Sequence, residues 1–174
     1  MMFVLPEFWG PSDCIRIRTA MDRGRASQAE IYADGYRVDE EARRAFEVDV
    51  DDEIVEEVQR AMDGTRSKVA HCFDTQLVGE EGPGFLRYVP GGFYRVHSDT
   101  APGWDDDFPR RISIVVFLTT AGADCEGGSL RLYGANALDI APRAGMLVAF
   151  PSDVPHEVLP VTAGVRDAVV DWFY

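Results

Sequence analysis

Two of the three histidines in this chain lie in patterns that could bind a metal ion. His97 and Asp99 are separated by one residue in a segment whose pattern is typical of a β-strand. Because side chains alternate between the two faces of a strand, both should point the same way. The other histidine, His156, follows Pro155 at the start of a later predicted strand. These three side chains are therefore the candidate metal ligands.

Two histidines and one carboxylate on one face of a barrel form the facial triad of non-haem iron(II) oxygenases. Three protein ligands on one face of an octahedron leave three sites for a bidentate cosubstrate and for O2. An H-x-D pair alone is weak evidence, because motifs this short often match by accident. His71, which stands alone near the end of a predicted helix, is expected to be structural.

An arginine ten residues after His156 strengthens the metal interpretation. In a strand from Val165 to Trp172, Arg166 shares one face with Ala168, Val170 and Trp172. A guanidinium buried among apolar groups needs an anionic partner. That partner could be Asp153 or Glu157, in an internal salt bridge. Alternatively, Arg166 could bind the carboxylate of a ligand, which its planar donors suit.

The elements that must position these residues differ between the two halves of the chain. Before residue 84 the pattern is mostly helical. Ser12 and Asp13 can cap a helix from Cys14 to about Arg23, and Asp51 and Asp52 can cap a second helix that Gly64 ends. In that second helix apolar residues recur at three- and four-residue spacing. Residues 28–47 are charged and mixed, and no regular structure is predicted there.

From about Gly84 onward, short strands alternate with Gly and Pro. The candidate strands are Phe85–Val89, Phe93–Ser98, Ile112–Thr119, Ser129–Tyr133, Ala137–Ile140, Met146–Phe150, His156–Val161 and Val165–Trp172. This spacing predicts a barrel or a double-sheet jelly roll, with the N-terminal helices on the outer face of one sheet. We expect a single domain, with a helical support region over 1–83 and a β core over 84–174.

Composition narrows the choice of partner. Thirty acidic against seventeen basic residues give a formal net charge of −13, which repels a phosphate backbone, so nucleic acid is not expected as a partner. No apolar run is long enough to span a membrane, and the first residues lack a secretory pattern, so we expect a cytoplasmic protein. The three scattered cysteines form no C-x-x-C pair and are expected to be reduced.

At this point the second half of the chain resembles a known family, the prolyl 4-hydroxylase-like branch of the Fe(II)/2-oxoglutarate dioxygenases. The resemblance runs from about Gly84 to Tyr174. It rests on the segments Arg87–Asp99, Arg110–Leu118, Glu126–Leu130, Pro142–Gly145 and Pro155–Val161, followed by Gly164 and Arg166. Their order and spacing agree with the family throughout. This set of segments is much more specific than the H-x-D pair.

The resemblance implies a mainly β fold with flanking N-terminal helices, the double-stranded β-helix or cupin-like jelly roll. It also implies that His97, Asp99 and His156 bind Fe(II) and that Arg166 binds the distal carboxylate of 2-oxoglutarate. Tyr88 would reach the same cosubstrate. O2 is the second cosubstrate, and ascorbate is a possible supporting reductant. On the substrate side the resemblance points to Arg110 and Trp172.

One position departs from the family pattern. Phe117 stands where relatives often carry a tyrosine whose hydroxyl can hydrogen-bond the cosubstrate. Losing a hydrogen bond to a charged group typically costs about 1.5–3 kcal/mol. The sequence therefore does not determine the affinity for 2-oxoglutarate, whereas the class of enzyme that the resemblance implies is unaffected.

The activity that the resemblance implies is hydroxylation of a C–H bond, coupled to the decarboxylation of 2-oxoglutarate to succinate. A prolyl residue in a peptide or protein is the favoured substrate, and a free amino acid or another small molecule is the alternative. Two other classes stay open. The first is a jelly-roll module that binds a metal or carboxylate without catalysis. The second is a zinc hydrolase, which would not need Arg166.

The segment 100–109 follows directly after Asp99, so it should lie at the mouth of the pocket. It contains Trp104, Phe108 and three consecutive aspartates. It could be a lid that contacts the substrate through Trp104, or a connecting turn. As a lid, its aspartates would favour a basic or neutral peptide through electrostatic steering.

Overall fold

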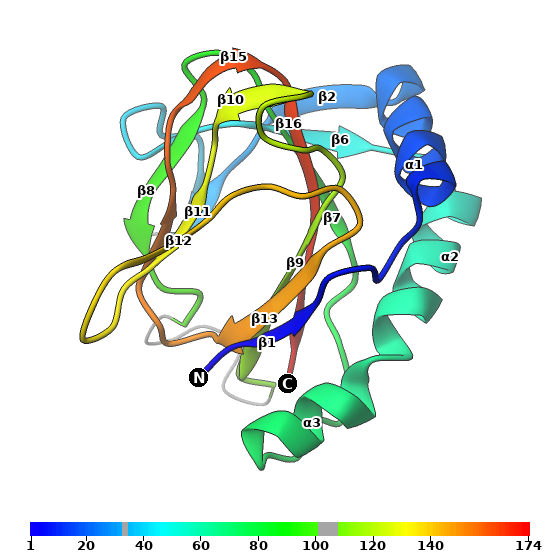
Figure 1. Ribbon diagram of the computed structural model, residues 1–174, viewed down its shortest axis with the longest axis vertical. Helices are drawn as coiled ribbons and strands as arrows, with labels where there is room; N and C mark the ends of the chain where they lie inside the picture. The colour runs from blue at the N-terminus through cyan, green and yellow to red at the C-terminus, as the bar shows by residue number, and fades with distance from the viewer. Residues whose placement is uncertain (33–34, 101–107) are drawn as a thin grey trace.

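Two antiparallel sheets face each other in the computed structural model, which describes residues 1–32, 35–100 and 108–174 (Figure 1). The larger sheet holds, in spatial order, β1 (Phe3–Leu5), β13 (Leu147–Pro151), β9 (Ile112–Phe117), β16 (Arg166–Phe173), β7 (Gly84–Tyr88), β6 (Phe46–Asp49) and β2 (Arg25–Gln28). The smaller sheet holds β12 (Leu138–Ile140), β11 (Leu130–Leu132), β14 (His156–Val158), β8 (Phe93–His97) and β5 (Arg43–Arg44). Two further pairs join β10 (Cys125–Gly127) to β15 (Val161–Gly164) and β3 (Ile31–Tyr32) to β4 (Tyr36–Arg37). The jelly-roll prediction is confirmed.

Three helices cover the outer face of the larger sheet: α1 (Pro11–Arg23), α2 (Asp52–Asp63) and α3 (Arg66–Phe73) (Figure 1). The first two, and the face that they cover, were predicted, whereas α3 lies beyond the predicted end at Gly64. Cys14, Ile17 and Met21 of α1 and Val58 and Met62 of α2 share a core cluster with the outward side chains of the sheet. In α1 the helix begins three residues before the predicted start. Pro at the first helical position suits a helix terminus, and the carboxylate of Asp13 accepts a hydrogen bond from the N–H of Gly10.

Strand β9 shows why a strand of the larger sheet can be apolar along almost its whole length. All six of its residues are buried. Ile112, Ile114 and Val116 face the helices, whereas Val115 and Phe117 belong to a second core cluster between the two sheets. A strand with both faces covered has no solvent side, so its hydrophobic pattern need not alternate with polar residues.

Seven of the eight predicted strands begin and end within two residues of an observed strand. The eighth prediction, one strand over His156–Val161, is wrong, because two strands lie there. Strand β14 pairs with β8 and β11, and the chain then passes through Leu159 and Pro160 into β15, which pairs with β10. Proline lacks an N–H and interrupts the ladder at this point. Strand β10, whose three residues end in Gly127, was not predicted.

The sequence predicted no regular structure for residues 28–47, and this too is corrected. Strand β6 pairs with β7 and so extends the larger sheet, with β2 as its edge. Strand β5 pairs with β8 and so extends the smaller sheet. These strands pair with strands far away along the chain. Strand β5 is only two residues long, and β6 alternates apolar and acidic residues over only four positions. No helix in the described ranges is long and apolar enough to cross a membrane.

A buried carboxylate on β16 makes the stability of this fold depend on pH. Asp171 is 0% exposed, and its Oδ1 accepts hydrogen bonds from the N–H groups of Gly82 and Trp172, at 3.0 and 2.7 Å. Its Oδ2 has no partner among the described residues. Burial raises the pKa of Asp171 to about 7.

We therefore expect Asp171→Asn to be more stable than the wild type at pH 8, by about 1–3 kcal/mol. The folded wild type holds this proton up to about pH 7, whereas the unfolded chain loses it near 3.8, so the free energy of unfolding falls as pH rises between these values. The advantage of the variant should shrink as pH falls from 7 toward 4. Denaturant unfolding of both proteins at pH 8 and pH 4.5 measures it. A difference that does not change with pH would contradict the assignment.

Candidate metal centre

His97, Asp99 and His156 meet between the two sheets, with one potential ligand atom of each within 4.8 Å of the others. His97 is the last residue of β8, and His156, the first of β14, lies directly opposite it in the register. Asp99 was predicted to follow His97 along one strand, but β8 ends at His97. Asp99 is held instead by a hydrogen bond from its N–H to the carbonyl of Ser152, at 2.9 Å. The structure thus brings together all three candidate ligands.

The hydrogen bonds of the two histidines leave the right nitrogens available for a metal. Nδ1 of His97 lies 2.8 Å from the carbonyl of Arg95, and Nδ1 of His156 lies 2.9 Å from the carbonyl of Val154. A carbonyl can only accept, so each Nδ1 carries the proton and each Nε2 keeps its lone pair. The tautomer that metal ligation requires is therefore fixed by the backbone.

The distances among the ligand atoms also fit a single ion. Nε2 of His97 lies 3.6 Å from Oδ1 of Asp99, and Nε2 of His156 lies 3.5 Å from Oδ2 of Asp99. These contacts are longer than ordinary hydrogen bonds. Two ligands that each lie about 2.1 Å from one ion are separated by roughly 3–3.5 Å. The donor set, two imidazoles and a carboxylate, suits a non-haem iron site.

Burial and charge hold His97 and Asp99 in the protonation states that a metal needs. Burial, together with the nearby His156, lowers the pKa of His97 to about 4, so its ring is neutral at physiological pH. Burial alone would raise the pKa of Asp99. The two histidines and hydrogen bonds from Ser113 and Trp172 outweigh that effect and lower it. A neutral histidine beside an ionised carboxylate is ready to bind a cation.

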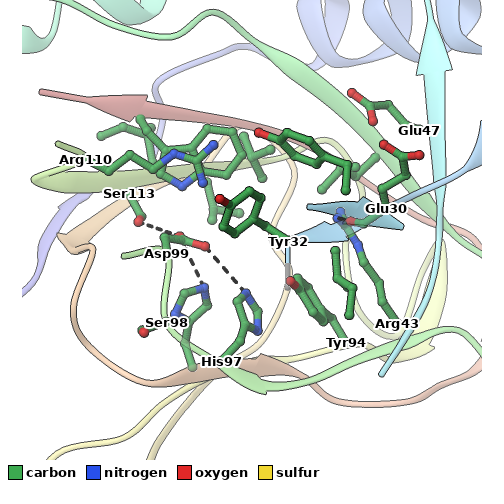
Figure 2. A pocket seen from close by; sticks show the side chains of 18 of the residues that line it. Glu30, Tyr32, Arg43, Glu47, Tyr94, His97, Ser98, Asp99, Arg110 and Ser113 are labelled. Carbon is green, nitrogen blue, oxygen red and sulfur yellow. Dashed lines mark hydrogen bonds and ion pairs between the residues drawn. The ribbon is translucent and has the colours of Figure 1, made fainter. Parts of the chain in front are cut away.

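A β-bulge adds a residue that sequence reasoning missed. Between β8 and β14 the register shifts, so that His97 faces His156 while Tyr94 faces Val158. Tyr94 and His97 therefore both line the same cavity, although they are three residues apart. The rings of Tyr94 and His97 stack with their centres 3.5 Å apart, and the guanidinium carbon of Arg43 lies 4.6 Å from the centre of the Tyr94 ring. In Figure 2 the Tyr94 ring lies between His97 and Arg43. Burial raises the pKa of Tyr94 to about 12.

The cavity onto which these side chains open has a volume of about 340 Å³. Of the residues expected to contact cosubstrate or substrate, Tyr88, Arg110 and Trp172 line it. Trp104 and most of the segment 100–109 lie outside the described residues. The opposite wall comes from the N-terminal half: Glu30, Tyr32, Arg43 and Glu47, which Figure 2 labels, with Ile31 and Tyr36. No motif in the sequence marked this wall, because its residues come together through the pairing of short strands.

Arg110 is fixed in the cavity wall by two neighbours. Its guanidinium donates to both carboxylate oxygens of Glu81, at 2.5 and 2.6 Å. It also lies 3.7 Å from the centre of the Trp172 ring. This stacked, paired arginine is held in place before any substrate arrives.

Arg166 is buried, with 2% of its surface exposed, as the alternation along β16 predicted. Its Nε donates to the carbonyl of Gly128 at 2.8 Å, and its guanidinium lies 4.9 Å from the Tyr88 ring and 5.2 Å from the Phe117 ring. Among the described residues no carboxylate lies within 4.0 Å of it. Glu157, one of the two partners considered from the sequence, lies beside Arg131 and Tyr133 instead. A buried cation without an anion is costly, so this site is suited to an anionic ligand.

Comparison with known proteins places the chain in a family. The family model of the 2OG-Fe(II) oxygenase superfamily matches residues 83–174, so the chain belongs to that superfamily. Proteins similar to it within that superfamily are PKHD-type hydroxylases and a prolyl-4-hydroxylase. The family uses Fe(II), 2-oxoglutarate and O2.

Individual relatives agree with this assignment. The chain is 36% identical to a PKHD-type hydroxylase of Acidovorax ebreus over 97 residues, which cover 52% of this chain and 41% of that protein. It is 27% identical to a PKHD-type hydroxylase of Nitrobacter winogradskyi over 178 residues, or 99% and 77% of the two chains. The match thus spans about two fifths of the length of the Acidovorax protein.

Solved structures extend the comparison to the whole fold. A Pseudomonas putida prolyl-4-hydroxylase superposes with a TM-score of 0.79 at 28% identity, covering 99% of this chain and 91% of that one. A prolyl hydroxylase from Trichoplax adhaerens, solved with a peptide fragment of hypoxia inducible factor, has the same TM-score at 22% identity and covers 99% and 83%. At 22% identity, the similarity to the Trichoplax adhaerens protein shows a shared fold alone.

We predict that His97→Ala, Asp99→Ala and His156→Ala each largely abolish binding of a divalent metal while the fold survives, because these side chains line a cavity. Anaerobic titration with Fe(II), followed by circular dichroism, measures both properties. His71→Ala is the matched control, since His71 is exposed on α3. Wild-type metal affinity in any of the three cavity variants would remove that residue from the ligand set.

Proposed function

We propose that this enzyme hydroxylates a prolyl residue in a peptide or protein, with Fe(II) held by His97, Asp99 and His156. The proposal is carried by the triad together with Arg166, a buried arginine that has no anionic partner among the described residues and contacts Tyr88 of the cavity wall. The prolyl substrate is supported by the 28% identity to the Pseudomonas putida prolyl-4-hydroxylase, which extends over nearly the whole chain. Hydroxylation of a free amino acid or other small molecule is the second candidate, since a cavity of about 340 Å³ is large enough to hold one.

In this proposal the protein's share of the chemistry is binding and orientation. Neutral Nε2 atoms of His97 and His156 and the carboxylate of Asp99 hold the metal on one face. When bound, the iron supplies the oxidation, with O2, of 2-oxoglutarate to succinate and CO2 and of a substrate C–H bond. The apolar inner faces of both sheets exclude water from the reacting groups.

Arg166 would bind the distal carboxylate of 2-oxoglutarate. Because its Nε is occupied by the carbonyl of Gly128, the two terminal nitrogens of the guanidinium are left for the ligand. Tyr88 lines the cavity and contacts Arg166, so its hydroxyl is suited to the same ligand. Phe117 offers an aromatic face to the guanidinium but no hydroxyl, which leaves Arg166 and Tyr88 as the polar contacts. Ascorbate as a supporting reductant stays a prediction.

The substrate side would be formed by Arg110, Trp172 and the N-terminal wall. Arg110 is held by Glu81 and stacks on Trp172, so it can donate hydrogen bonds to a peptide carbonyl with little loss of side-chain entropy. Glu30 and Glu47 outweigh Arg43 on this wall, so its net charge is negative. A neutral or basic peptide suits that wall better than an acidic one.

The test is turnover by the iron-loaded protein with proline-containing peptides, free proline and other free amino acids. We expect succinate formation together with a mass gain of one oxygen atom on a peptide, and neither with the matching peptide in which Ala replaces Pro. Hydroxylation of a free amino acid alone would establish the second candidate. Absence of substrate-coupled succinate with every compound, from protein that binds Fe(II), would favour a binding module without catalysis.

Arg166→Met should raise the KM for 2-oxoglutarate by about 10-fold or more, because it keeps the apolar stem but removes the charged donors, each worth about 1.5–3 kcal/mol. The affinity for Fe(II) should change little. Arg131→Met is the control, since Arg131 pairs with Asp139 on the outside of the smaller sheet. Uncoupled 2-oxoglutarate decarboxylation gives the KM. An unchanged KM with a lowered melting temperature would make Arg166 a purely structural residue.

A further inference from the structure

Two buried serines lie beside Asp99, and the proposed function gives neither of them a role. Ser113 is on β9, and its Oγ lies 2.6 Å from Oδ2 of Asp99 (Figure 2). Ser152 follows β13 directly, and its Oγ lies 2.9 Å from Oγ of Ser113. They are 2% and 0% exposed. We propose that Ser152 and Ser113 form a hydrogen-bond relay that orients the Asp99 carboxylate toward the metal, which makes both of them positioning residues.

The direction of the relay follows from counting protons. Each serine hydroxyl has one proton to donate. A carboxylate that binds a metal is ionised and can only accept. The proton of Ser113 therefore goes to Asp99, and the contact between the serines must be filled by the proton of Ser152. The order is Ser152 to Ser113 to Asp99, and each bond polarises the next.

Ser152 also holds the backbone of Asp99. Its carbonyl accepts the N–H of Asp99 at 2.9 Å, and its own N–H donates to the carbonyl of Arg111 at 2.9 Å. Ser152 thus reaches Asp99 by two routes, one to the main chain and one, through Ser113, to the carboxylate. This matters because Asp99 lies beyond the end of β8, where no strand pairing fixes its side chain.

The surroundings argue against a role in packing. The next inward side chains along β9 are Val115 and Phe117, in an apolar cluster between the sheets. A hydroxyl buried beside such a cluster costs free energy unless it is hydrogen-bonded, and alanine would avoid that cost. The side chain of Trp172, on the adjacent strand β16, lines the same cavity as Asp99 and helps to lower the pKa of that carboxyl.

This inference rests on the proposed assignment of Asp99 as a metal ligand, and the experiment separates the two. Co(II) binding to the full chain is measured by calorimetry, without 2-oxoglutarate or substrate, for Ser113→Ala, Ser152→Ala, the double variant and Ser113→Thr. The visible spectrum of bound Co(II) reports the ligand geometry. Melting temperatures of the metal-free proteins report folding. Asp99→Ala is included as the reference for loss of the ligand itself.

We expect Ser113→Ala to weaken Co(II) binding about 10- to 100-fold, as loss of a group that hydrogen-bonds a metal ligand typically does. Ser152→Ala should weaken it less, since Ser113 can still donate. The double variant should match Ser113→Ala, because the relay reaches the carboxylate only through Ser113. Ser113→Thr keeps the hydroxyl and should restore both the affinity and the spectrum.

Two results would overturn the relay. One is unchanged Co(II) affinity and spectrum in Ser113→Ala while Asp99→Ala loses the metal. The other is additive losses in the double variant, which would mean that the serines act independently. If Asp99→Ala itself binds Co(II) as the wild type does, the ligand assignment fails instead. None of these outcomes depends on whether a prolyl peptide is the substrate.

Discussion

The pairing of β8 with β14 is the constraint on which the rest of the site depends. It sets His97 opposite His156, and a slip of one residue would turn one of the two imidazoles away from the cavity. The bulge next to this pair then adds Tyr94 to the same face. Strand pairing supplies two of the three candidate ligands, and the third, Asp99, must be positioned by hydrogen bonds because it lies beyond the strand. The serines and Trp172 surround the one ligand that the sheet does not hold.

How far the sequence could predict this structure depends on where each signal lies. The strands after Gly84 are apolar or alternating runs bounded by Gly and Pro, so their positions could be predicted, as could the outward helices and the burial of Arg166. Strands β5 and β6 were missed because they are short and lie in a highly charged segment. Tyr94 was missed because a bulge leaves no mark in a two-residue period, and the serines because a short polar side chain in a strand resembles many others. The predictions that failed depend on which strands pair with each other. Those that succeeded depend on the kinds of side chain along a single segment.

The two walls of the cavity differ in origin. The family match covers residues 83–174, which contain the triad and Tyr88 of this cavity. The facing wall, with Glu30, Tyr32 and Glu47, comes from residues before that match. A division of this kind lets the metal and cosubstrate side stay constant while the other side adapts to a substrate, as expected where one fold serves many reactions. Selectivity should therefore be sought in the N-terminal strands.

Arg166 also shows how the fold and its ligand depend on each other. Among the described residues its guanidinium contacts one carbonyl and two aromatic rings. These contacts compensate only part of the free-energy cost of burying a charge. An anionic ligand that completes the pairing would recover that cost. By linkage, whatever binds the folded state alone also stabilises it. Asp167, the next residue along β16, shows the contrast: it is 0% exposed but pairs with Arg87 through two 2.8 Å contacts. On neighbouring positions of one strand, the protein itself pairs the charge of Asp167, whereas in the proposed function a ligand pairs that of Arg166.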